Sequence, residues 1–201
     1  MNKMLDIPEG MDIIEIRKKI NKLLSQARTA AKPDKCILCG EKKTSFCNSH
    51  SVPQLSLKNI AENGMVLHAS ALMGIDVVDI EKGVNNSGTF HFICNECDNS
   101  FFQDYENEQN LKSKPTDKML AEIAVKNFLL QLSKRTQEEE LYKILQKQFN
   151  AYENPEDLAG ITSLDVRDFR EELQFHKVIA ETCSNGEYQI LKSDKSRKAY
   201  L

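Results

Sequence analysis

The 201-residue sequence contains no tryptophan, only five prolines and eight glycines, and no long uninterrupted apolar run. A membrane-spanning helix needs about 20 consecutive apolar residues, so we expect no membrane partner. The low proline and glycine content excludes collagen-like and low-complexity chains, and 40% hydrophobic with 28% charged residues favours a mostly helical soluble globule. The first residues lack the basic-then-apolar pattern of a signal peptide, so we expect a cytoplasmic protein.

An excess of basic charge is also missing, since the formal net charge is −3. Net charge therefore gives no argument for nucleic acid, and any contact with it must be local. Three clusters of Lys and Arg are candidates for such a contact, although a solvated surface is the simpler interpretation of each: residues 32–43, 112–118 and 192–198.

Hydrophobic periodicity predicts helices on both sides of a cysteine-containing middle segment. Apolar residues recur at helical spacing along one face of each segment, with charged residues opposite. His176 falls on the apolar face of the last helix, where a hydrogen-bonded core histidine is the simpler interpretation than a metal ligand. The predicted elements are helices over 11–31, 115–149 and 164–181, a loop around 154–163 and a final strand over 186–192.

The six cysteines include two C-x-x-C pairs, Cys36/Cys39 and Cys94/Cys97. In a reducing compartment, clustered cysteines are more often metal ligands than disulfides. Zinc prefers four tetrahedral thiolate or imidazole ligands, and a C-x-x-C turn presents two sulfurs to one ion. Gly40 follows the first pair, where a tight turn needs positive φ. The second pair stands where a strand over 87–94 enters a helix. We therefore predict a structural Zn²⁺ bound by all four cysteines.

A local grouping is an alternative. Cys36, Cys39, Cys47 and His50 form a C-x2-C-x7-C-x2-H set that could bind one zinc, leaving His91 and the second pair to a three-ligand site. Metal content distinguishes the two, because the four-cysteine site requires one zinc per chain and the local grouping requires two. In the four-cysteine interpretation Cys47 and Cys183 bind no metal. The simpler interpretation of a lone cysteine is a small buried hydrophobic residue.

The order of these motifs resembles the zinc-containing branch of the HNH (His-Asn-His, ββα-metal) endonucleases. The resemblance rests on a C-x-x-C turn, then "NSHSVPQ", then a strand running into C-x-x-C at a helix start. It implies a mainly α fold with a small α+β treble-clef (ββα-metal-like) zinc module between flanking helices. The corresponding regions are an N-terminal amphipathic helix (1–33), the zinc module (34–110) and a helical C-terminal region (111–201).

The resemblance also implies roles for individual residues. His50 matches the family's first histidine, which is the general base for water, and Asp98 matches a ligand of a catalytic divalent ion (Mg²⁺, Mn²⁺ or Ni²⁺). His91 is expected to assist Asp98, and Thr89 or Asn99 to orient the phosphate. Three positions depart from the family pattern. Ser49, before the base, and Phe102, at the position of the second helix ligand, are poor metal ligands. Thr89 replaces the family's middle asparagine.

Glu106 is not expected to be a co-ligand. It lies eight residues beyond Asp98, which is roughly 12 Å along a helix axis. Only an irregular helix could bring the two carboxylates together.

A closer likeness is to a little-characterised group of bacterial proteins related to the same superfamily. It covers residues 34–135 and rests on "SHSVPQLSLKNIAENG", "SGTFHFICNECDNSFFQDYE" and "TDKMLAEIAVKNFLLQLSK". Two functions are compatible with it. One is a metal-dependent endonuclease, expected in bacterial defence or in a mobile element. It would act on DNA rather than RNA, with Lys42, Lys43 and Lys112 contacting the backbone. The other is a non-catalytic zinc module that binds protein or nucleic acid, or forms a homo-oligomer, through its flanking helices.

Overall fold

The computed structural model describes residues 13–66, 70–72, 75–77, 82–149 and 155–188. These residues are mainly helical, as predicted. The helices are α1 (Ile13–Ala30), α2 (Gln54–Ile60), α3 (Asn95–Phe101), α4 (Glu108–Leu111), α5 (Asp117–Phe149), α6 (Pro155–Thr182) and the 3-10 helix η1 (Val84–Asn86). The strands are β1 (Ser49–His50), β2 (Met65–Val66), β3 (Ser70–Leu72), β4 (Ile75–Val77), β5 (Lys82–Gly83) and β6 (Thr89–Phe90).

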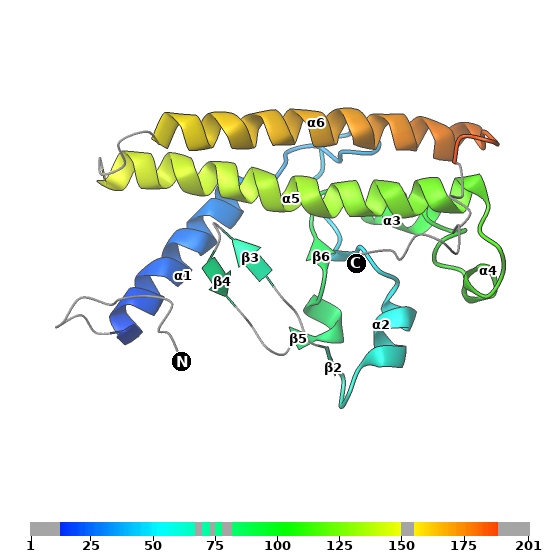
Figure 1. Cartoon of the computed structure of the whole chain (residues 1–201), viewed down its shortest axis with the longest axis horizontal. Helices are drawn as coiled ribbons and strands as arrows, with labels where there is room; N and C mark the ends of the chain where they lie inside the picture. The colour runs from blue at the N-terminus through cyan, green and yellow to red at the C-terminus, as the bar shows by residue number, and fades with distance from the viewer. Residues whose placement is uncertain (1–12, 67–69, 73–74, 78–81, 150–154, 189–201) are drawn as a thin grey trace, which may run out of the picture.

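The two long helices, α5 and α6, run antiparallel side by side, and the smaller elements lie along one side of α5 (Figure 1). The N-terminus of α5 is capped by Thr116, whose Oγ1 accepts a hydrogen bond from the Met119 amide at 3.2 Å. Val125, Leu129 and Leu132 are fully buried at helical spacing. No helix among the described residues combines the length and apolar character that a bilayer crossing requires.

The predicted loop around 154–163 is wrong, because α6 begins already at Pro155. Proline is well tolerated in the first turn of a helix, where its missing N–H needs no partner. Gly160 weakens a helix by only about 1 kcal/mol, and the burial of Thr162 and Val166 in the same stretch offsets this cost. Helix packing therefore extends α6 through residues that resemble a loop in composition.

A two-stranded antiparallel sheet joins segments that are far apart in the sequence. β1 pairs with β6, with Ser49 opposite Phe90 and His50 opposite Thr89. The strand expected over 87–94 is confined to Thr89–Phe90. Beyond it His91 is exposed, whereas Phe92, Ile93 and Cys94 are all buried. Strands β2 with β5 and β3 with β4 form two further small antiparallel pairs. The strand predicted over 186–192 falls mostly outside the described residues.

One hydrophobic core connects the cysteine-containing segment to the long helices. Its buried members come from the first cysteine turn, from β6 and α3 with their flanks, and from α5 and α6. They are Cys36, Leu38, Phe90, Phe92, Ile93, Cys94, Phe102, Val125, Leu129, Leu132, Val166 and Leu173. Two of the cysteines are thus part of the main core, so distortion of the cysteine cluster is expected to disturb the packing of α5 and α6.

The core-histidine interpretation of His176 is confirmed. Its ring stacks between Phe128 and Tyr188, at centroid distances of 5.4 and 5.8 Å. Its Nδ1 lies 2.6 Å from the Tyr188 hydroxyl. Burial lowers the pKa of His176, and the nearby Glu172 carboxylate only partly opposes this shift. The neutral ring is therefore favoured in the folded state.

This lowered pKa predicts a pH dependence of stability. A histidine with a depressed folded-state pKa contributes its full stabilisation above the unfolded-state value of about 6.5, and this contribution is lost as the pH falls below it. We expect the free energy of unfolding, measured by urea titration, to fall below about pH 6.5. In His176→Phe, which keeps an aromatic ring for stacking, this part of the pH dependence should disappear. An unchanged pH profile in the variant would contradict the assignment.

Candidate functional site

The first cysteine pair lies in a tight turn. The Gly40 amide donates to the Cys36 carbonyl at 2.8 Å, and the Cys36 amide donates to the Glu41 carbonyl at 2.9 Å. Gly40 has φ +75°, a conformation that side chains other than glycine rarely adopt. The turn presents Cys36 and Cys39 on the same side.

The second pair lies at the start of α3, as predicted. Cys94 occupies the N-cap position in an extended conformation, and the Asp98 amide donates to the Cys94 carbonyl at 3.0 Å. The Cys94 amide also points at the Cys36 sulfur, with a nitrogen–sulfur distance of 3.4 Å. Amides at a helix start stabilise nearby negative charge, so this amide favours the thiolate form of Cys36.

The four sulfur atoms form one compact cluster. Those of Cys36, Cys39, Cys94 and Cys97 all lie within 4.8 Å of one another. A tetrahedron with zinc–sulfur bonds of about 2.3 Å has edges of about 3.8 Å, so the four sulfurs need to move little to bind one zinc ion. The Cys39 and Cys94 sulfurs are 4.0 Å apart, much farther than the disulfide bond of about 2.05 Å. The cluster thus has the composition and spacing of a structural zinc site.

The protonation of the cluster is expected to be coupled to metal binding. Burial opposes ionisation of Cys36, but the amides of Cys39, Cys94 and Leu38 outweigh it and lower the pKa of the Cys36 thiol to about 7. Burial raises the pKa of both Cys94 and Cys97. Without a cation the cluster would therefore hold few thiolates. A bound zinc ion stabilises deprotonated cysteines, so zinc binding should release protons.

The alternative grouping with Cys47 and His50 is not the one formed. The Cys47 thiol donates to the Ile93 carbonyl at 3.2 Å, and burial together with the nearby Asp98 charge raises its pKa to about 12. His50 instead has its Nε2 3.0 Å from the Val84 carbonyl. Within the described part of the chain, the four cysteines are the only group of three or more His, Cys, Asp or Glu residues whose ligand atoms lie close enough together to hold one metal ion.

Substitution of Cys47 tests this grouping. Cys47→Ser keeps a donor for the Ile93 carbonyl, so the purified variant should retain one zinc per chain and lose no more than about 1 kcal/mol of stability. Zinc is measured by elemental mass spectrometry and stability by denaturant unfolding. Loss of zinc from this variant would instead support zinc binding by Cys36, Cys39, Cys47 and His50.

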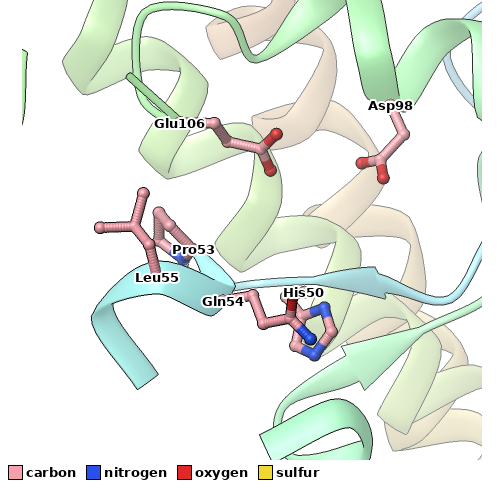
Figure 2. Close-up of a pocket in the computed structure, with 6 residues that line it drawn as sticks. All are labelled: His50, Pro53, Gln54, Leu55, Asp98 and Glu106. Atoms are coloured by element: carbon pink, nitrogen blue, oxygen red, sulfur yellow. The ribbon is translucent and has the colours of Figure 1, made fainter. Parts of the chain in front are cut away.

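A cavity of about 210 Å³ lies between the end of β1, the start of α2, and α3 with the segment that follows it. Figure 2 shows the carboxylates of Asp98 and Glu106 pointing toward one another, with the His50 ring on another wall. The cavity is lined by His50, Pro53, Gln54, Leu55, Asp98 and Glu106. It therefore brings together the predicted base, the predicted metal ligand and a second carboxylate.

Glu106 reaches this cavity because α3 is short. The helix ends at Phe101, Phe102 leaves helical geometry with φ −104° and ψ 26°, and the chain then turns back. The turn is held by Tyr105, whose amide donates to the buried Glu122 carboxylate at 2.7 Å. The separation of about 12 Å expected for a continuous helix therefore does not apply.

A buried lysine connects the two carboxylates. Lys126, on α5, has a side chain that is 1% exposed, and its ammonium lies 3.4 Å from Asp98 Oδ1 and forms an ion pair with Glu106. The Ser49 hydroxyl donates to the same Asp98 oxygen at 2.5 Å. The sequence analysis did not identify Lys126. The available signal was a lysine four residues after Glu122, on the face of α5 that carries the buried residues.

The other candidate residues lie outside the cavity lining. Thr89 is half-buried and faces His50 across the sheet, whereas His91 and Asn99 are exposed. Two of the three candidate backbone-binding lysines have acidic partners: Lys43 lies 3.5 Å from Glu96, and Lys112 lies 2.6 Å from Glu108. Lys42 is exposed. The basic cluster at 192–198 falls outside the described residues.

Comparisons with protein-family models, with curated proteins and with solved structures each find no match for this chain. The interpretation of the site therefore depends on its own residues. These form a four-cysteine cluster suited to zinc and a cavity that contains one histidine and two carboxylates.

Proposed function

We propose that the chain is an HNH-like, metal-dependent endonuclease in which a treble-clef zinc module holds the active site. The observation that supports this most is the cavity shared by His50, Asp98 and Glu106. The paired β1 and β6 followed by α3 reproduce the ββα order that the resemblance implies. In this proposal the zinc ion is structural, because four thiolates leave it no open coordination position.

His50 is the proposed general base. A carbonyl oxygen can only accept a hydrogen bond, so the contact with Val84 places the proton of the neutral ring on Nε2 and leaves Nδ1 as the acceptor. An imidazole in this tautomer can take a proton from water near neutral pH. In the HNH family an asparagine orients the base; here the Val84 carbonyl does so in place of Thr89.

Asp98 and Glu106 are the proposed ligands of a divalent ion. Carboxylate oxygens suit Mg²⁺ and Mn²⁺, and two facing carboxylates fit such an ion better than Asp98 with the exposed His91. Among the six lining residues of the described cavity none carries a permanent positive charge, so an anionic phosphodiester would be repelled without added cation. A divalent ion bound there would neutralise the phosphate and stabilise the leaving oxygen.

The test is a cleavage assay on plasmid DNA, single-stranded DNA and RNA. The zinc-loaded protein is incubated with Mg²⁺, Mn²⁺ or Ni²⁺, and with none of these ions. We expect hydrolysis only with an added ion and less of it in Asp98→Asn, with DNA preferred over RNA. Absence of cleavage with every ion and substrate would overturn the proposal.

A second candidate is a zinc-containing module without catalysis. It is favoured by the ion pairs of Lys126, which already compensate one of the two carboxylate charges. Partners would then bind the flanking helices, where α6 exposes large apolar side chains: Ile161, Leu164, Phe175 and Val178. Tight binding of a protein, a second copy or nucleic acid without any cleavage would support this candidate.

A further inference from the structure

We propose that Lys126 is an internal counter-cation that sets how tightly Asp98 and Glu106 hold a divalent metal ion. This inference rests on the proposed function for its metal site, but not for its reaction. Lys126 does not line the cavity. It would regulate the affinity for the metal ion through the two carboxylates that it contacts.

The geometry around Lys126 is that of an occupied cation site. Its ammonium contacts Asp98 and Glu106 and lies 4.5 Å from the centroid of the Phe102 ring, so each of these three neighbours stabilises positive charge. The side chain is 1% exposed, whereas the two carboxylates also line the cavity. Both carboxylates therefore lie between the buried ammonium and the cavity.

This arrangement has a direct electrostatic consequence. With Lys126 charged, the two carboxylates and the ammonium have a net charge of about −1. A cation in the cavity is therefore attracted less strongly than it would be by the two carboxylates alone. The ammonium also repels a divalent ion and competes for the same oxygens. We therefore expect the wild-type protein to bind divalent ions weakly. The fraction of protein with an ion at Asp98 and Glu106 should then rise with the metal concentration.

The test is Lys126→Met, a substitution that keeps a long unbranched side chain and removes the charge. Mn²⁺ is titrated into the zinc-loaded, full-length protein, and the free ion is measured by electron paramagnetic resonance. Mn²⁺ prefers oxygen ligands and should leave the thiolate site to zinc. We expect Mn²⁺ to bind at least about tenfold more tightly to the variant, because removing the ammonium leaves two neighbouring carboxylates without a compensating charge and removes a cation that repels Mn²⁺.

Two further variants make the test specific. Lys143→Met is the matched control, because Lys143 lies on the same helix and contacts Glu139 and Glu140, which do not line the cavity. It should leave Mn²⁺ affinity unchanged. Adding Asp98→Asn to Lys126→Met should abolish the gain.

A folded Lys126→Met protein that binds Mn²⁺ no more tightly than the wild type would overturn the inference and leave Lys126 a purely structural residue. If Lys126→Met is unfolded, Lys126→Gln is measured in the same way, with thermal unfolding in millimolar Mn²⁺ as a second readout. We expect Mn²⁺ to raise the melting temperature more in Lys126→Gln than in the wild type. Failure of Mn²⁺ to stabilise either variant also overturns the inference. Loss of DNA cleavage alone does not, because the readout is metal binding.

Discussion

Cys94→Ser is expected to lower the free energy of unfolding by about 4 kcal/mol or more, the range of the largest single-substitution effects, which include loss of a metal. Cys94 is buried in the main hydrophobic core, and its sulfur lies 4.0 Å from that of Cys39. The two cysteine pairs come from distant segments, and the zinc ion connects them. Loss of one ligand should therefore release the zinc and separate the two segments. Denaturant unfolding and zinc content of the purified variant measure the two effects.

Cys183→Ser is the control for this prediction. Cys183 is exposed and lies outside the four-cysteine cluster, so its substitution should change neither zinc content nor stability beyond about 0.5 kcal/mol. The zinc site would be wrong as described if Cys94→Ser kept one zinc and the wild-type unfolding midpoint.

His50→Ala is expected to reduce the cleavage rate by about 10²- to 10⁴-fold, the usual contribution of a general base. The loss should appear in kcat rather than in substrate affinity, because the proposed role of His50 is to take a proton from water. Single-turnover cleavage with saturating protein measures it. Zinc content and helicity should be unchanged, since His50 lies outside the cysteine cluster.

His91→Ala is the matched control for His50→Ala. His50 is the last residue of β1 and His91 directly follows β6, but His91 is exposed and does not line the cavity. Its loss should therefore leave the rate within about twofold of the wild type, since it would remove no acid–base group from the site. Equal losses in the two variants would return His91 to the ligand set, and a fully active His50→Ala would exclude His50 as the base.

The local sequence patterns predicted much of the site. The two C-x-x-C pairs indicated the four-cysteine cluster because each motif specifies its own turn and ligand geometry. These features depend on residues close in the sequence, whose relative positions are fixed by the backbone.

The features that were missed depend on tertiary structure. Glu106 reaches the cavity only because α3 ends early, and a turn held by Glu122 of α5 then folds the chain back. Lys126 is buried only because its partners come from segments 20 and 28 residues away. A hydrophobic pattern assigns charged residues to the solvent unless their partners are known. The start of α6 was also not predicted, because its packing partners cannot be read from the local sequence. Helix packing there overrides a loop-like composition.

The most direct test of the four-cysteine site is X-ray absorption spectroscopy at the zinc edge of the purified protein, combined with its zinc content. We expect one zinc per chain, surrounded by four sulfur atoms at about 2.3 Å. Two zinc ions per chain, or a first shell containing an imidazole nitrogen at about 2.0 Å, would show that the two cysteine pairs do not share one ion.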